Sequence, residues 1–130
     1  MLKYCTKILH VFGHAFGREN PEWIEITVDE LFERLDSDPP ALLIDVRSVE
    51  DYFDGYGHIP NAVSIPMLEL ESKLESLSSY KDREIVTMCP GGGLSLVAID
   101  ILTEAGFKNV KSLKGGTDMW HEKGYPITSE

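Results

Sequence analysis

Cysteine is scarce in this chain. Its 130 residues include 2 cysteines, Cys5 and Cys89, which lie far apart and in no paired-thiol motif. A disulfide framework or a cysteine-based zinc site therefore has no support, and we expect a reducing, cytoplasmic compartment. Long apolar runs are also missing, because no window approaches the ~18 uninterrupted apolar residues that a membrane-spanning helix needs. We therefore expect no membrane span.

Positive charge is in short supply as well. The chain has 12 Lys+Arg against 22 Asp+Glu, which gives a net charge of −10. Such a surface repels phosphate backbones and anionic lipid heads, so we expect neither nucleic acid nor a membrane as a partner. The apolar content of 42% is too high for a disordered acidic tail. The length fits one globular domain.

The first part of the chain reads differently from the rest. We interpret residues 1–22 as an N-terminal extension and residues 23–130 as the domain. Two lysines precede an apolar run, as in a signal peptide, but histidines and a glycine interrupt that run and no A-x-A cleavage pattern follows. His10 and His14 have a spacing that can chelate a metal, yet no third ligand stands nearby, so no metal site is predicted. Cys5 is interpreted as incidental, although a resolving role toward the second cysteine stays open.

Strand and helix signals alternate from residue 23 onward. The run 41–46 is almost wholly apolar, which is typical of a strand buried on both faces. The alternation predicts an α/β fold with a mainly parallel sheet and right-handed crossovers. The predicted strands are 23–26, 41–46, 62–66, 84–88 and 109–113. The predicted helices are one capped by Thr27, then 48–53, 67–77, one that starts near Ser95 and ends at Gly106, and 117–122.

A cysteine follows the predicted strand 84–88, at the edge of a parallel sheet where ligands gather. Cys89 opens a loop with three consecutive glycines that leads into a helix. Glycine amides turned inward form a nest, and together with a helix N-terminus they stabilise a thiolate or a persulfide. We expect a Cβ at Gly92 or Gly93 to disturb this nest. The alternative is an inert buried thiol beside a tight turn. No P-loop is present, because the Lys-Ser/Thr ending is missing.

Short motifs recur along the rest of the chain in a fixed order. They are 43–47 (LIDVR) with Glu50, 57–62 (GHIPNA) leading to 64–66 (SIP), the Cys89 loop, 105–110 (AGFKNV), 113–116 (LKGG), Trp120 and 124–126 (GYP). In this order they resemble the single-domain rhodanese family of sulfurtransferases. The resemblance implies a rhodanese-like fold with a central, mainly parallel five-stranded sheet flanked by helices on both faces.

The resemblance also implies a reaction and roles for particular residues. Cys89 would be the nucleophile that takes sulfane sulfur from a small-molecule donor as a persulfide and passes it to a thiol, cyanide or another nucleophile, with no cofactor. The loop's backbone would bind the substrate sulfur, and the supporting residues would be Asp45, Arg47 and His58. In the family the first two organise loops, and we interpret His58 as a loop-packing residue although an imidazole could serve as an acid or base. The predicted substrate-binding loop residues are Pro90, Gly91, Gly92, Gly93, Leu94 and Ser95.

One loop position departs from the family pattern. The rhodanese loop has six residues and usually ends in Arg, whereas Leu94 stands at that place here. An Arg would bind the oxygens of thiosulfate through charge-assisted hydrogen bonds. We therefore expect weak activity with thiosulfate, and a polysulfide, a small persulfide or a protein persulfide as donor. The short loop argues against related phosphatases and arsenate reductases. A catalytically weak binding or sulfur-carrier module remains the alternative.

Overall fold

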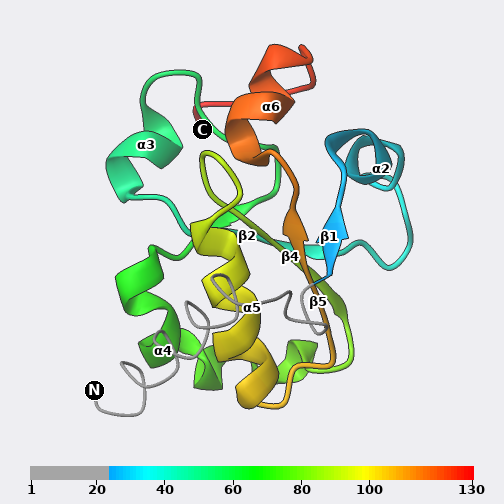
Figure 1. Ribbon diagram of the computed structural model, residues 1–130, viewed down its shortest axis with the longest axis vertical. Coiled ribbons are helices and arrows are strands. Elements are labelled where there is room, and N and C mark those ends of the chain that lie inside the picture. The colour runs from blue at the N-terminus through cyan, green and yellow to red at the C-terminus, as the bar shows by residue number, and fades with distance from the viewer. Residues whose placement is uncertain (1–23) are drawn as a thin grey trace, which may run out of the picture.

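The computed structural model describes residues 24–130. Five strands form one sheet in the order β1-β5-β4-β2-β3, and all neighbouring strands are parallel (Figure 1). The predicted extension, Cys5, His10, His14 and Trp23 lie outside the described residues, so the boundary before residue 23 stays a prediction. The strands are β1 (Glu25–Ile26), β2 (Leu42–Asp45), β3 (Val63–Ser64), β4 (Glu84–Met88) and β5 (Asn109–Leu113).

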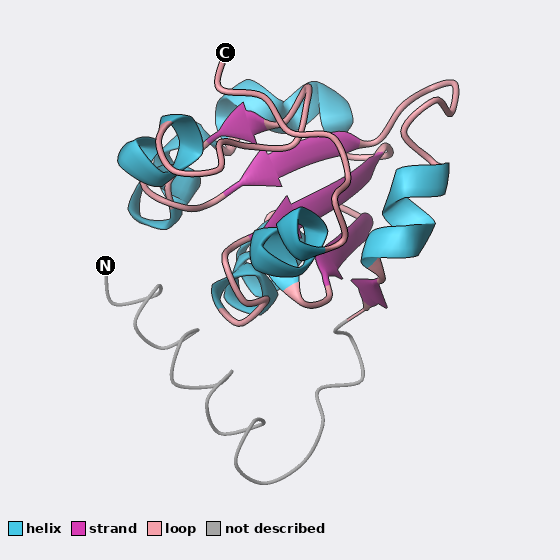
Figure 2. Ribbon diagram, turned by 90° about the horizontal axis from the view of Figure 1, so that it is seen from above, coloured by secondary structure: helices cyan, strands magenta, loops and turns pink. Residues whose placement is uncertain are grey.

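Helices cover both faces of the sheet (Figure 2). Neighbouring residues of a strand point to opposite faces, and in β4 the fully buried Ile85 and Val86 belong to two different apolar clusters. One cluster packs α5 (Leu94–Glu104) and α4 (Leu70–Lys73) on the sheet. The other packs α2 (Val28–Glu33), α3 (Val49–Phe53) and α6 (Gly116–Glu122). The predicted fold class is therefore confirmed.

Local sequence signals set several helix ends. Thr27 and Glu30 form a reciprocal capping box at the start of α2, and the Ser48 hydroxyl accepts from the third residue of the next helix. Just after the C-terminal end of α5, Gly106 has a φ of +100°. Its amide and that of Phe107 bond back to carbonyls of the last turn, so glycine ends the helix as the sequence predicts.

The predicted helix 67–77 is not continuous. The chain forms a 3₁₀ turn η1 (Met67–Glu69), the short α4 and a second 3₁₀ segment η2 (Glu75–Tyr80). The hydroxyls of Ser72 and Ser76 donate to the carbonyls three residues earlier, at 2.7 and 2.6 Å, and so compete with the helical pattern. The apolar face survives because Leu70 and Leu77 are still buried.

Parallel pairing brings three strand ends to one edge of the sheet. Asp45 of β2 pairs with Met88 of β4, and Thr87 of β4 pairs with Ser112 of β5. The segments that follow these strands must therefore lie next to one another. Within residues 24–130, no helix has the length and apolar character needed to cross a bilayer.

Candidate active site

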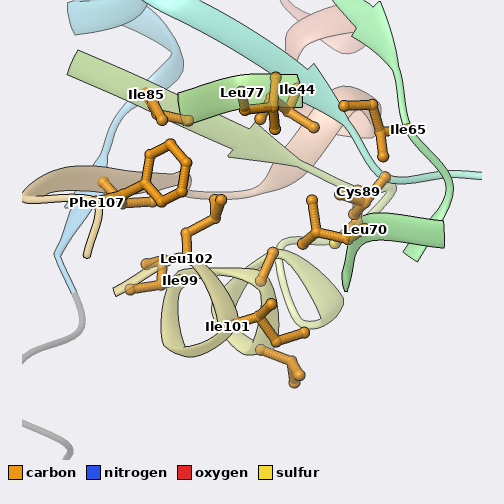
Figure 3. Packing of buried hydrophobic residues seen from close by; sticks show 14 residues of the cluster. Ile44, Ile65, Leu70, Leu77, Ile85, Cys89, Ile99, Ile101, Leu102 and Phe107 are labelled. Atoms are coloured by element: carbon orange, nitrogen blue, oxygen red, sulfur yellow. The ribbon is translucent and has the colours of Figure 1, made fainter. Parts of the chain in front are cut away.

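The thiol of Cys89 is buried at the carboxyl end of β4, with 2% of the residue exposed. It belongs to the apolar cluster under α5, where Figure 3 shows it at the end near Leu70. Its Sγ accepts hydrogen bonds from the backbone amides of Gly92 at 3.1 Å and Ser95 at 3.4 Å. Two preformed donors therefore converge on a sulfur that is otherwise shielded from water.

The sulfur also substitutes for a helix cap. Gly93 is the N-cap residue of α5 and offers no side chain to the free amides of the first turn. The Ser95 amide, in that turn, donates to the Cys89 sulfur instead. Since the N-terminus of a helix carries partial positive charge, the sulfur lies at the partially positive end of α5.

Fewer backbone amides contact the sulfur than the sequence predicts. Pro90 has no N–H to donate, and the amides of Gly91, Gly93 and Leu94 make no hydrogen bond to the sulfur. The expectation for Gly93 is wrong, because it has an ordinary φ of −83° and open space around a Cβ. Gly92 does need to be glycine: its φ is +94° and an added Cβ would lie 3.2 Å from the amide nitrogen of Gly115.

The first turn of α6 holds the Cys89 loop in place through backbone hydrogen bonds. The amide of Thr117 donates to the Cys89 carbonyl at 2.9 Å, and that of Asp118 donates to the Pro90 carbonyl at 3.0 Å. Gly116 lies so close that an added Cβ would be 2.3 Å from both carbonyl oxygens. In the sequence Gly115 and Gly116 stand out only as part of the 113–116 (LKGG) motif, since nothing local reveals which backbone they face.

Asp45 and Arg47 form a buried ion pair at the end of β2. The guanidinium donates to the carboxylate through Nε at 3.0 and 3.1 Å and through a terminal nitrogen at 2.7 Å. The same terminal nitrogen donates to the Gly57 carbonyl at 2.8 Å, which fixes the 54–58 loop. Burial alone lowers the pKa of Arg47, but the hydrogen bonds and charge of Asp45 outweigh it, so the pKa is raised.

His58 is buried away from the sulfur's hydrogen bonds. Its Nδ1 lies 2.7 Å from the Tyr52 carbonyl, and its ring stacks on the Tyr52 ring with 3.5 Å between centroids. Its backbone pairs with Thr128 in both directions. These contacts tie the GHIPNA loop to the C-terminal segment, and none of them reaches Cys89.

An open pocket of about 270 Å³ lies beside the loop. Its lining residues are Arg47, Asp51, Asp54, Gly55, Tyr56, Pro90 and Asp118. Carboxylates outnumber the single guanidinium, which is already bonded to Asp45. The Tyr56 hydroxyl donates to the Asp118 carboxylate at 2.5 Å. The pKa of Tyr56 is raised, mainly by burial and in second place by this hydrogen bond. The sequence does not reveal this acidic lining, because Asp51 and Asp54 lie far from Asp118 along the chain.

Two hydroxyls complete the surroundings of the sulfur. The Cys89 thiol lies 3.5 Å from the Ser95 hydroxyl, which lies 2.6 Å from the Ser112 hydroxyl. The sequence prediction included Ser95 only for its amide and missed Ser112. The sequence offers no clear signal for Ser112, because three of the five residues of β5 are polar. Among residues 24–130, no three metal-ligating side chains converge.

Comparison with known proteins adds to this geometry. The family model of the rhodanese-like domain matches residues 27–123. The chain belongs to the rhodanese-like domain family. A putative sulfurtransferase, YtwF of Bacillus subtilis, is 37% identical over 78% of this chain and 94% of its own length. A sulfurtransferase of Allochromatium vinosum is 31% identical over 81% of this chain and 94% of its own length.

Solved structures agree with the rhodanese-like fold. A rhodanese-related protein from Thermoplasma volcanium superimposes with a TM-score of 0.73 at 29% identity, covering 83% of this chain and all of that protein. The resemblance stated from the motifs is thereby confirmed. Membership of the family and the names of these relatives support a rhodanese-like sulfurtransferase role.

Proposed function

We propose that this rhodanese-like domain is a sulfurtransferase in which Cys89 carries sulfane sulfur as a persulfide. The observation that carries the proposal is the pair of amides, from Gly92 and Ser95, that converge on the sulfur at the start of α5. The position at the carboxyl edge of a parallel sheet, next to an open pocket, supports it further.

The reaction takes place in two steps. In the first, the Cys89 thiolate attacks the outer sulfur of a donor persulfide, the donor's S–S bond breaks, and its electron pair leaves with the donor thiolate. In the second, an acceptor thiolate or cyanide attacks the outer sulfur of the cysteine persulfide. That S–S bond breaks and the Cys89 thiolate is restored. The substituted-enzyme intermediate predicts ping-pong kinetics.

The pocket's electrostatics support a donor other than thiosulfate. Thiosulfate is a dianion, whereas Asp51, Asp54 and Asp118 line the pocket and the Arg47 guanidinium is already engaged. Leu94, half exposed at 53%, adds no cation to the loop. We propose a polysulfide, a small persulfide or a protein persulfide as donor, because sulfur then enters with less oxyanion charge to neutralise.

We propose that Asp45, Arg47 and His58 hold the loops around the site in place and take no part in the chemistry. The buried Asp45–Arg47 pair holds the 54–58 loop that forms one wall of the pocket. His58 packs against Tyr52 and anchors the C-terminal segment. Neither is assigned a proton-transfer step.

Intact-mass spectrometry after exposure to a polysulfide tests the proposal. We expect one or more sulfur adducts of about 32 Da each on Cys89, removed by cyanide or a thiol acceptor. A Cys5→Ser variant should load in the same way, and Cys89→Ser should not load. If a well-folded protein gains no sulfur while a known sulfurtransferase loads under the same conditions, the proposal fails.

A sulfur-carrier module is the second candidate. The burial of Cys89 to 2% exposure favours it, since small acceptors would reach the sulfur slowly. A relative of this chain, the putative sulfur carrier protein YrkF of Bacillus subtilis, is 32% identical over 85% of this chain and 58% of its own length. Stable sulfur loading without multiple turnover with any small acceptor would favour this candidate over the enzyme.

The cellular setting is proposed on chemical grounds. A free nucleophilic thiol needs a reducing compartment, which supports the cytoplasm. The net charge of −10 argues against nucleic acid as a partner. Residues 1–22 are proposed as an extension ahead of the catalytic domain.

A further inference from the structure

Behind the Cys89 sulfur lies a short row of buried hydroxyls. Cys89 Sγ is 3.5 Å from Ser95 Oγ, and Ser95 Oγ is 2.6 Å from Ser112 Oγ. Ser95 and Ser112 are both fully buried. We propose that these two hydroxyls form a relay that stabilises charge on the sulfur, with Ser95 as a catalytic residue and Ser112 as its positioning residue. The inference rests on the proposed function, in which Cys89 is the nucleophile.

The hydrogens in this row can reverse direction. While Cys89 is a neutral thiol, its S–H donates to the Ser95 hydroxyl oxygen. When the sulfur is ionised it can only accept, so the Ser95 O–H turns toward it. The Ser112 O–H then donates to the Ser95 oxygen, since either atom of that pair can be the donor. The thiolate therefore gains a third donor beyond the amides of Gly92 and Ser95.

The sheet and the helix hold the row in place. Ser112 of β5 is paired in register with Thr87 of β4. The Thr87 hydroxyl donates to the Ser95 carbonyl at 2.9 Å, which ties the first turn of α5 to the sheet. Buried hydroxyls are costly unless they are hydrogen-bonded, and here each serine satisfies the other. A fixed donor needs no reorganisation when charge appears on the sulfur.

The relay acts on a particular part of the cycle. In the persulfide, negative charge lies on the outer sulfur and Sγ is neutral. When an acceptor removes the outer sulfur, charge returns to Sγ and the relay stabilises this leaving group. We therefore expect loss of the relay to slow sulfur release to the acceptor. Charged groups of the same edge, Arg47, Asp45 and Asp118, make no hydrogen bond to the sulfur and remain in every variant.

The experiment measures thiol ionisation and sulfur release separately, in the full chain with Cys5→Ser so that one cysteine reacts. The pH dependence of alkylation by iodoacetamide is followed by intact mass for Ser112→Ala, Ser95→Ala and Ser112→Thr. We expect the midpoint of the profile to rise by about one pH unit in the alanine variants, which corresponds to about a tenfold change. Release of sulfur from the preloaded protein to cyanide should slow by about tenfold. Ser112→Thr, which keeps a hydroxyl, should stay near the parent.

Ser64→Ala is the matched control, because Ser64 Oγ is also buried but has no hydrogen-bond partner among the described residues. If Ser95→Ala and Ser112→Ala behave like this control in both measurements, the relay is refuted. If Ser112→Ala does not fold, Ser95→Ala alone decides. Failure of the proposed function is distinguishable, because the parent protein would then take up no sulfur whatever the alkylation profiles show.

Discussion

The polar groups at the two ends of β4 and β5 differ in charge. Near the amino ends, the Glu84 carboxylate pairs with Lys111 at 2.5 Å and also with Arg34, and these side chains are partly exposed. At the carboxyl ends, the polar groups around Cys89 are backbone amides and the neutral hydroxyls of Ser95 and Ser112, all buried. The amino ends therefore carry charges that already have counterions. The carboxyl ends carry neutral hydrogen-bonding groups that can stabilise an anion.

The difference shows what prepares a buried anion site. Burial raises the pKa of Glu84, but its bonds to Lys111 and Arg34 outweigh this and lower it, so the carboxylate stays charged with its own counterions. Such a pair has no charge left for a substrate, and partly exposed pairs contribute little stability. Amides and hydroxyls around Cys89 carry no net charge, so they can stabilise charge that appears only during reaction.

The largest expected effect comes from removing the proposed reacting atom, the Cys89 sulfur, at the carboxyl end. Cys89→Ser should reduce sulfur transfer to background, a loss of at least about a thousandfold, while the fold remains intact because the volume hardly changes. Steady-state transfer to cyanide and circular dichroism measure the two effects. Cys5→Ser should retain most activity, and full activity in Cys89→Ser would move the nucleophile elsewhere.

A second test compares two glycines near the sulfur. Gly116→Ala should displace the Cys89 and Pro90 carbonyls, since its Cβ would lie 2.3 Å from both oxygens, and transfer should fall by about a hundredfold or more. Gly93→Ala should lose only a few-fold, because its φ of −83° and open surroundings accept a Cβ. Transfer rates and thermal unfolding of both variants check this. Equal losses in the pair would show that the loop's contact with α6 does not position the sulfur.

A third test adds at the carboxyl end the charge that the amino end already has. Leu94→Arg should raise kcat/KM for thiosulfate by about ten- to a hundredfold, the effect of one charge-assisted hydrogen bond. Leu94 is half exposed, so the substitution should not disturb the core. Activity with a polysulfide donor should change less. An unchanged thiosulfate rate in a folded variant with reactive Cys89 would contradict the role given to the missing Arg.

The smallest effect is expected at the amino end. The folded-state pKa of Glu84 is lowered, so its stabilisation is present above the unfolded pKa and is lost as pH falls through the folded pKa. Glu84→Gln should therefore lower the free energy of unfolding by about 1 kcal/mol or less at pH 7, with the difference fading below about pH 4. Urea unfolding at several pH values measures it. Sulfur transfer should stay at the parent rate, and a large loss of transfer would show that the amino end also contributes to the reaction.

Much of the fold, and the proposed nucleophile, follow from local patterns in the sequence. The strands 84–88 and 109–113 have the predicted bounds, because a glycine-rich turn follows each of them closely. Thr27 and Gly106 set helix ends through contacts within a few residues. The place of Cys89 between a strand and a glycine loop predicts its role as the nucleophile. By contrast, the leucine spacing predicts one helix at 67–77, where the chain forms two 3₁₀ segments around the short α4.

The sequence alone thus determined the alternation of elements, the parallel sheet and the cysteine at its edge, because periodicity and capping act over short distances. Only the tertiary structure decided which groups surround the sulfur. Ser112 reaches Ser95 through the pairing of β5 with β4, and Gly116 meets the Cys89 carbonyl through the path of the chain after β5. Three separate segments supply the acidic pocket. These contacts join residues distant in sequence, and strand order and register fix them, which no local pattern records.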